Sequence, residues 1–523
     1  MKNHEIEAAW QYHNGTKHSY QSIRANRHYL DWENQPIPFK IYPDLEPIAL
    51  PEHLSSSDVP ALEAISASGV DPDRQVAPTL QELAEILFLS AGITKRRKYP
   101  GGEILFRAAA CTGALYHIDL YVVCGDLEDL EAGVYQFSPQ DFAVRRLRSG
   151  DYRSFLVEAS GEESAIANAP CVIVSASTFW RNAWKYQTRA YRHCYWDNGT
   201  ILANLLAAAG ARKIATKIVL SFVDAAVNQL LGLDSQREAP LSLVALGHSS
   251  ATRIGLSPPI APLALETTPL SKTEVDYPAM RAMHEASSLA SEAEVAAWRE
   301  GAKKAEGVAK AEGDRIRDKR AEPRLFPLEP LSDDALPREA IEEVIMRRGS
   351  TREFARESIT YSQLSTMLDC ATRGIPAEFL SSAEASLNDL YLIVHAVDGL
   401  PAGSYFFRQQ QQALELLKEE DFRREAGYLG LGQTIPADCS VNVYFLADLK
   451  NVLERFGNRG YRAAQLEAAI MGGKLYLAAY AQRLGASGLT FFDDDVTEFF
   501  SPHAEGKSVM FLIALGKSVK QRK

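Results

Sequence analysis

The 523-residue sequence has little of what marks secreted, zinc-bound or membrane proteins. Its six cysteines are scattered and none lies in a CxxC pair, so we expect neither disulfide bonds nor structural zinc. No run approaches the roughly 18 apolar residues of a membrane-spanning helix. The first residues, MKNHEIEAAW, lack a basic start followed by an apolar core, so no signal peptide is expected. The sequence therefore predicts a cytoplasmic protein.

Positive charge and familiar catalytic motifs are also scarce. The net charge of −11 argues against nucleic acid or an anionic membrane as partner. No G-x-S-x-G motif or nucleophile triad is present, and LGLGQ (429–433) lacks the third glycine of a dinucleotide fingerprint. His193 and Asp197 have metal-ligand spacing but no evident third ligand, so we predict no metal site. These absences leave an enzyme or a binding protein as the expected class of protein.

What the chain does contain is an internal repeat. DLYVVCGDLEDLEAGVYQF (119–137) and DLYLIVHAVDGLPAGSYFF (389–407) agree at eight of nineteen positions at an offset of 270. Chance alone would give about one identity at average residue frequencies. Tyr191-Arg192 and Tyr461-Arg462 match in the same register. The repeat predicts two copies of one domain, related by a pseudo-two-fold axis, in a fused dimer whose halves can specialise.

The repeat and the composition divide the chain into four parts. We expect an extended N-terminal arm (1–60), a first domain (61–255), a Pro-rich and charged helical linker (256–335) and a second domain (336–523). Within the linker, the Glu/Lys-rich stretch 291–320 predicts a solvated helix. Short apolar runs and amphipathic stretches predict a mixed α/β or α+β fold. The expected helices are 79–91, capped by Thr79 and stopped by Gly92, 194–209, 338–348, 361–372 and 460–484, and the expected strands are 118–123, 171–177, 241–247, 390–397, 404–408, 441–447 and 508–515.

Two segments have residues suited to a phosphate and to a flat ligand. RRGSTREF (347–354) groups three arginines around Ser350, and arginine forks with a hydroxyl suit phosphate oxygens. A solvated basic turn is the alternative. RAAACTGALYHIDLY (107–121) has small residues through Cys111, Gly113 and Ala114 that let the backbone lie close to a flat ligand. The alternative is a tight turn before a strand.

A third segment, WRNAWKYQTRAYRHCYWDNG (180–199), is dense in aromatic and cationic groups. A lysine held among aromatic rings is partly desolvated, which lowers its pKa and makes it a feasible base. The alternative is an amphipathic helix whose rings are core. In the second repeat Arg455-Phe456 stand where Lys185-Tyr186 would be, so only the first copy keeps this pair.

Together these segments resemble the FMN-dependent nitroreductase superfamily, in particular its SagB/ThcOx-type azoline dehydrogenase branch. RGSTREF is similar to the superfamily's Arg-Arg-Ser-x-Arg phosphate motif, with Gly349 where an arginine often stands. ACTGALYH resembles the branch's Pro-Ser-Ala-Gly-Ala-Leu-Tyr-Pro turn, with Cys111 replacing the serine and His117 the last proline. WKYQTR resembles its Lys-Tyr motif. The arm (12–43) and the segment 210–247 resemble its first and closing segments.

The resemblance implies an α+β fold with two nitroreductase-like domains, each a mixed or antiparallel sheet flanked by helices. It also implies FMN across the interface between them. The second half would supply Arg348, Ser350, Arg352, Gly485, Ser487, Gly488 and Lys517, and the first half Cys111, Gly113, Ala114 and the catalytic pair Lys185 and Tyr186. The pseudo-symmetric position lacks both the arginine motif and the small-residue turn. We therefore expect one FMN per chain.

For function, the resemblance implies dehydrogenation of azoline rings in a modified peptide to azoles. A hydride would pass to the flavin and a proton to Lys185 or Tyr186, and the sequence does not choose between the two. A peptide cyclase is an expected partner. The alternatives are an NAD(P)H-dependent reductase of small-molecule nitroaromatics or quinones, and a non-catalytic flavin- or peptide-binding protein.

Overall fold

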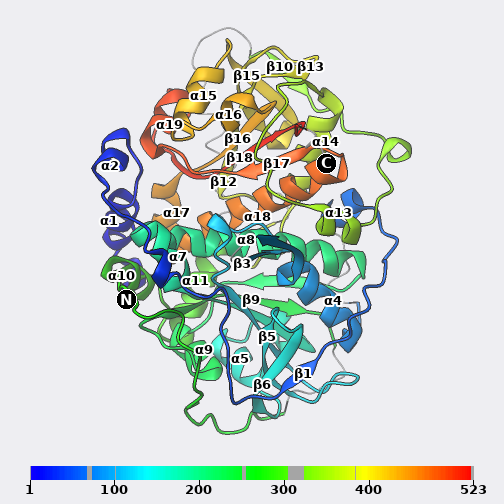
Figure 1. Ribbon diagram of the computed structural model, residues 1–523, viewed down its shortest axis with the longest axis vertical. Coiled ribbons are helices and arrows are strands. Elements are labelled where there is room, and N and C mark those ends of the chain that lie inside the picture. The colour runs from blue at the N-terminus through cyan, green and yellow to red at the C-terminus, as the bar shows by residue number, and fades with distance from the viewer. Residues whose placement is uncertain are drawn as a thin grey trace.

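Each half of the chain is built on an antiparallel seven-stranded sheet, and the two sheets have the same topology (Figure 1). The computed structural model describes residues 2–66, 74–99, 102–249, 255–303, 323–382 and 385–519. The first sheet has the order β1 (Pro47–Ala49), β6 (Ala143–Ser149), β5 (Gly133–Ser138), β4 (Ile118–Cys124), β7 (Cys171–Thr178), β9 (Glu238–Leu246) and β8 (Thr216–Val219). The second has the order β10 (Leu325–Pro327), β15 (Ala413–Glu419), β14 (Gly403–Arg408), β12 (Asn388–Val394), β16 (Val441–Ala447), β18 (Ser508–Gly516) and β17 (Gly485–Gly488). The α+β class and the duplicated domain are confirmed.

Helices flank both sheets, and their starts follow the sequence signals. Thr79 and Glu82 form a capping box at the start of α4 (Leu80–Ala91), and Thr360 with Gln363 repeats it at α14 (Tyr361–Thr372). The other helices of the first half are α3 (Ala61–Ser66), α5 (Arg153–Ala159), α6 (Ser164–Ala167), α7 (Phe179–Tyr186), α8 (Ala190–Ala211) and α9 (Asp224–Leu231). Those of the second half are α13 (Ile341–Arg347), α15 (Arg423–Leu429), α16 (Thr434–Asp438), α17 (Leu449–Phe456), α18 (Arg459–Ala481) and α19 (Asp493–Phe500).

The long helices α8 and α18 pack against each other between the two sheets (Figure 1). A Cβ on Gly199 would lie 2.5 Å from the Cβ of Ala469, and a Cβ on Gly473 would lie 2.5 Å from that of Ala203. Both pairs follow the offset of 270, so the backbones approach most closely where the pseudo-two-fold axis passes. Gly210 does not end α8, which continues to Ala211 because the preceding alanines keep good helix propensity.

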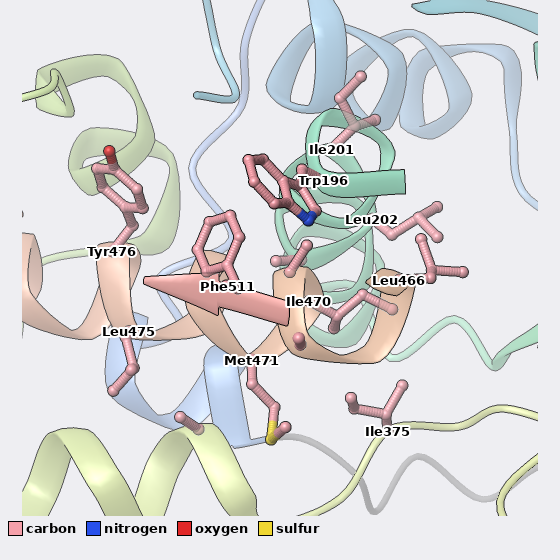
Figure 2. Close-up of a cluster of buried hydrophobic side chains, with 14 of the residues drawn as sticks. Trp196, Ile201, Leu202, Ile375, Leu466, Ile470, Met471, Leu475, Tyr476 and Phe511 are labelled. Carbon is pink, nitrogen blue, oxygen red and sulfur yellow. The ribbon is translucent and has the colours of Figure 1, made fainter. Parts of the chain in front are cut away.

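Apolar side chains from both halves fill the space around this helix pair. Figure 2 shows one such cluster, in which side chains of α8 and α18 meet Phe511 of β18. Its labelled members are Trp196, Ile201, Leu202, Ile375, Leu466, Ile470, Met471, Leu475, Tyr476 and Phe511. One continuous core therefore joins the two domains, as an obligate dimer interface would.

Two reciprocal ion clusters bridge the halves at the ends of this helix pair. Arg189 and Arg192 of the first half bind Asp493 of the second, with N–O distances of 3.0 and 2.6 Å. Arg459 and Arg462 of the second half bind Asp224 of the first in the same way. Those N–O distances are 2.6 and 2.7 Å, and all six side chains are buried. We call these the Asp493 cluster and the Asp224 cluster.

The arm and the linker complete these clusters, which corrects two expectations. The arm is not simply extended: it has α1 (Glu7–Gly15) and α2 (Tyr20–Ala25), and Thr16 accepts a hydrogen bond from Arg192. The linker has α10 (Pro278–Ala286) and α11 (Glu292–Lys303), and Trp298 of α11 is buried against Phe456. A helix forms at 292–303 as expected, but one side of it is not solvated, because Val295 and Trp298 are buried; 304–320 lies outside the described residues.

Two further, two-stranded sheets lie among the described residues. β2 (Ile93–Tyr99) and β3 (Gly102–Arg107) form a two-stranded ribbon ahead of the small-residue turn. β11 (Ile359–Thr360) pairs with β13 (Val397–Asp398). Among the described residues, no helix is long and apolar enough to cross a membrane.

Candidate active site

The small-residue turn is a tightly wound backbone held by a single carboxylate. Gly113, Ala114 and Tyr116 have φ values of +66, +55 and +46°, a conformation that costs energy for the two residues with a Cβ. Asp197 of α8 accepts hydrogen bonds from the Thr112 N–H and hydroxyl, at 2.9 and 2.7 Å. Its other oxygen binds the ring of His117 at 2.9 Å. Asp197 of α8 therefore fixes a strained turn that lies next to the last residue of α7.

Cys111 serves the turn itself. Its thiol donates to Asp197 at 3.0 Å and accepts from the Tyr116 N–H at 3.1 Å. Burial, and then the charge of Asp197, raise the pKa of Cys111 well above its usual range, so the thiol stays protonated. Since that proton is bound to Asp197, the hydrogen-bond donors that Cys111–Ala114 present to a ligand are backbone groups.

Lys185 and Tyr186 end α7, and Tyr186 lies directly against this turn. A Cβ on Gly113 would lie 2.8 Å from the hydroxyl oxygen of Tyr186, so only glycine leaves room for the phenol. The Lys185 Nζ lies 5.3 Å from the centroid of the Tyr186 ring. On its other side the Tyr186 ring meets His193 edge to face, with centroids 4.6 Å apart. The turn and the pair form one wall.

The pKa values of these two residues shift in opposite directions, which the sequence did not reveal. Burial, and then the positive charge of Arg352, lower the pKa of Lys185. Burial, and then the charges of Asp197 and Cys111, raise the pKa of Tyr186. Burial and Arg352 therefore make the Lys185 ammonium easier to deprotonate, while the Tyr186 phenol keeps its proton.

The arginine motif of the second half reaches across to the first half. Arg348 donates to the carbonyl oxygens of Ala108 and Arg107, at 2.7 and 3.0 Å, immediately before the small-residue turn. Arg352 is exposed and close enough to Lys185 to lower its pKa. Arg347 instead forms an ion pair with Glu339, so it is a structural member of the motif.

Behind the motif lies β17, which carries GASG (485–488). The Thr351 N–H donates to the Ala486 carbonyl at 2.8 Å, and a Cβ on Gly485 would lie 2.3 Å from the Thr351 hydroxyl oxygen. Tyr476 of α18 joins the two segments, because its hydroxyl lies 3.3 Å from that of Ser350 and accepts from the Gly488 N–H. The glycines therefore keep β17 and the arginine loop in close contact.

Some predicted residues are placed less simply. Ser487 is buried and its hydroxyl has no hydrogen-bond partner within the described residues, which a ligand at this position would supply. Lys517 is about half exposed, and its ammonium pairs with Glu357 at 3.4 Å. Its backbone carbonyl accepts from the Ala355 N–H, so Lys517 supports the arginine loop through its main chain.

The residues present fit an anionic, flat cofactor such as FMN. Two arginines suit a phosphate, and Ser487 offers a buried hydroxyl with no partner among the described residues. A Cβ on Gly488 would lie 3.5 Å from the nearest side chains, so the backbone there is open to close approach. These groups come from both halves and meet through Arg348 and Arg352. Arg348 lies against the segment before the small-residue turn and Arg352 lies near Lys185, whereas the Lys517 side chain pairs with Glu357.

The pseudo-symmetric position is filled by the chain itself. The Ile218 N–H of β8 donates to the Pro376 carbonyl at 2.7 Å, and the Glu378 N–H donates to the Ile218 carbonyl at 3.0 Å. Glu378 then accepts from the N–H groups of Leu220 and Ser221. Since β8 is the counterpart of β17, the segment Ile375–Glu378 lies along the strand edge equivalent to the one that carries Ser487.

The other parts of that position are replaced as well. Glu467, the counterpart of Asp197, accepts from the hydroxyl of Ser386 at 2.8 Å and the amide of Asn388 at 2.7 Å. Burial raises the pKa of Glu467 to about 7. Arg455, the counterpart of Lys185, donates to the Gly301 carbonyl of α11 at 2.8 Å. Segments of the linker and of nearby loops therefore occupy the pseudo-symmetric position.

Sequence reasoning missed Asp197 and Tyr476. Asp197 was considered only as half of a metal-ligand spacing with His193, whose ring instead binds Asn182 at 2.8 Å. A carboxylate on a helix predicted to be buried must find hydrogen-bond donors, and this signal could have identified Asp197. Tyr476 gave no such signal, because a tyrosine on a buried helix is ordinarily core.

Comparison with known proteins agrees with this architecture. The pattern of the nitroreductase family matches residues 73–248 and 345–517, once in each half. Two proteins, each named "putative nitroreductase", are similar. One, from Methanocaldococcus jannaschii, is 28% identical over 170 residues, covering 32% of this chain and 81% of that protein. The other, a crystal structure from Anabaena variabilis, is 27% identical with a TM-score of 0.76 and covers 98% of this chain and 99% of that one. The chain is a nitroreductase-family oxidoreductase with two family domains in tandem.

Proposed function

We propose that the protein is an FMN-dependent dehydrogenase that oxidises azoline rings of a modified peptide to azoles. The observation that carries the proposal is the composite wall: burial and Arg352 of the second half lower the pKa of Lys185, and Lys185 lies next to Tyr186, whose hydroxyl packs against Gly113. A reductase that takes hydride from a nicotinamide needs no amine base at this place, whereas a ring oxidation does.

The cofactor would be held by both halves. Arg348, Ser350 and Arg352 would bind the phosphate, and Gly485, Ser487 and Gly488 would lie along it, with the Ser487 hydroxyl supplying a donor that is otherwise unused. The backbone of Cys111, Gly113 and Ala114 would face the ring, and Lys517 would support the arginine loop. When bound, FMN supplies a hydride acceptor.

Lys185 and Tyr186 have different roles in the proposed proton transfer. Lys185 takes the proton from the ring carbon of the substrate, because burial and the charge of Arg352 lower the pKa of its amine and ease its deprotonation. Tyr186 keeps its proton and orients the substrate as a hydrogen-bond donor, since burial raises its pKa. Asp197 is a positioning residue that holds the turn on which Tyr186 packs.

The test compares two pseudo-symmetric variants on a synthetic thiazoline peptide. Lys185→Ala should keep FMN bound and lose formation of the thiazole, which mass spectrometry detects as loss of two hydrogens. Arg455→Ala, at the counterpart position, should retain turnover. If Lys185→Ala turns over at the wild-type rate, the base assignment is wrong.

The second candidate is an NAD(P)H-dependent reductase of nitroaromatics or quinones, which the names of the two relatives favour. Mixing the holoprotein with NADPH without oxygen separates the two functions. Rapid loss of the flavin absorbance, with no thiazole formed in the peptide assay, would favour the reductase.

We also propose one FMN per chain, with domain boundaries at 61–255 and 336–523. The support is that Ile375–Glu378 and the linker fill the pseudo-symmetric position. Flavin released from purified protein should give a flavin-to-chain ratio near one. A ratio near two would contradict the proposal.

A further inference from the structure

The N-terminal arm continues past α2 as a segment, Asn26–Asn34, that is fastened to α7. The Asn26 amide donates to the Gln187 side chain at 2.9 Å, and the His28 ring binds the Trp184 carbonyl at 2.9 Å. The Trp184 indole N–H donates to the Asp31 carbonyl at 3.0 Å. These bonds surround the end of α7, which is where Lys185 and Tyr186 lie. We call this segment the strap.

An apolar cluster joins the strap to the candidate active site. Leu115 of the small-residue turn packs with Trp180 and Trp184 of α7 in a small core of their own. Leu30 of the strap and Tyr186 of the reactive pair both pack against it. The strap is therefore continuous with the wall that carries the proposed base.

Two large aromatic side chains of the strap remain in solvent although the segment is fastened. Tyr29 is 86% exposed and Trp32 is 66% exposed. The Trp32 ring meets Trp184 edge to face, with centroids 5.3 Å apart, so its orientation is fixed while most of its surface stays open. An oriented ring with a free face loses little entropy when a ligand stacks on it.

We propose that the strap forms the substrate-side wall of the composite site, and that Trp32 and Tyr29 stack on a flat ring of the modified peptide. The inference rests on the proposed function for the identity of the ring. A thiazole or oxazole is planar and aromatic, whereas the cysteine or serine from which it derives is not, so aromatic faces distinguish the two. The strap thus selects peptides that already carry rings.

Binding of a product peptide tests the strap apart from catalysis. The probe is a synthetic hexapeptide with one central thiazole, and its partner is the same peptide with the unmodified cysteine. Isothermal titration of the FMN-loaded protein should give tighter binding of the thiazole peptide. Trp32→Ala and Tyr29→Ala should each weaken it by about 3- to 10-fold, the range for an aromatic pair. Trp32→Phe should restore most of the affinity.

Tyr428→Ala is the matched control, because Tyr428 is a 46% exposed tyrosine on α15 of the second half. It should bind the thiazole peptide as the wild type does. All variants should keep their flavin content and melting temperature, since the substituted side chains are exposed.

The outcomes separate the strap from the dehydrogenase. If Trp32→Ala and Tyr29→Ala bind the thiazole peptide as tightly as the wild type, the strap proposal is wrong even where Lys185→Ala confirms the dehydrogenase. If the wild type binds neither peptide but binds nitrobenzoate with a dependence on Trp32, the strap still receives a flat ring while the azoline proposal fails. Equal weakening by Tyr428→Ala would make the effect non-specific and overturn the inference.

Discussion

Replacing Asp493 by asparagine removes the charge that two buried arginines share across the domain interface. Arg189 and Arg192 approach the Asp493 carboxylate at 3.0 and 2.6 Å, and all three side chains are buried. Breaking a buried pair by removing one partner costs about 3–5 kcal/mol, because the other charge is left uncompensated. Typical proteins have about 5–15 kcal/mol of stability, so Asp493→Asn should consume a large part of it.

Asp224→Asn is the matched perturbation at the other end of the pseudo-two-fold axis. Asp224 binds Arg459 and Arg462 at 2.6 and 2.7 Å, so the loss of stability should be similar. The functional effects should differ. Arg189 lies over the Trp196 ring at 5.7 Å, and Trp196 contacts His193, which packs on the proposed catalytic pair. Only Asp493→Asn should therefore also reduce flavin retention.

Urea unfolding and flavin content after dialysis measure the two effects. Both variants should unfold at lower urea concentration, with free energies of unfolding reduced by about 3–5 kcal/mol. Flavin retention should fall in Asp493→Asn and stay near wild type in Asp224→Asn under native conditions. If both variants keep wild-type stability, the clusters do not hold the halves together. If Asp224→Asn loses flavin as readily, the site is not at the end of the pseudo-dimer that we assign.

The same clusters predict how stability depends on pH. Burial lowers the pKa of His13 and lowers that of His284 to about 3, so both rings stay neutral in the folded state. The unfolded chain binds these protons below about pH 6.5, and stability therefore declines as the pH falls through that value. Arg459 and Arg462 hold the pKa of Asp224 low against its burial, so its contribution is present above about pH 4 and is lost below it. Melting temperatures measured from pH 8 to 4 should fall, and a flat profile would contradict the assignment.

Three further predictions concern the site. Arg352→Gln should raise the pKa of Lys185 and shift the rising limb of the kcat profile to higher pH, while Arg352→Lys should leave it in place; an unchanged profile in Arg352→Gln refutes the electrostatic role. Gly113→Ala places a Cβ 2.8 Å from the Tyr186 hydroxyl at φ +66°, and should cost about 1–2 kcal/mol and weaken FMN binding in a flavin titration. Glu378→Ala leaves buried N–H groups without an acceptor, at about 1–3 kcal/mol each by urea unfolding, and should leave one flavin per chain.

The sequence predicted the elements best where a local pattern decides them. The predicted strand 441–447 is β16, and the predicted helix 361–372 is α14. An apolar run bounded by breakers and a capping box of Thr360 with Gln363 are local, so tertiary contacts had little to override. The arm failed as an extended segment because its short helix α1 is stabilised by contacts with α10 and α18, which no local pattern reveals.

The candidate site was predictable for a different reason. Its proposed residues lie in four short segments and at Lys517, and the repeat predicted that these belong to two domains facing each other. What the sequence did not contain is the detail of protonation and support. Asp197 holds the turn from 80 residues away, and burial together with the charge of Arg352 from the other domain lowers the pKa of Lys185. Such contacts follow from the fold rather than from spacing along the chain.

The two halves have changed unequally, and the pattern of change indicates what the duplication serves. The residues that hold the halves together keep their symmetry: Arg189 with Arg459, Arg192 with Arg462, and Asp224 with Asp493. The residues of the site do not, since Asp197 corresponds to Glu467. The longer Glu467 side chain accepts hydrogen bonds from Ser386 and Asn388, and the segment Ile375–Glu378 pairs with β8. The sequence alone indicated that the pseudo-symmetric position lacks the arginine motif and the small-residue turn. Only the fold shows which segments of the chain lie at the equivalent position, and this supports the proposal of one composite site per chain.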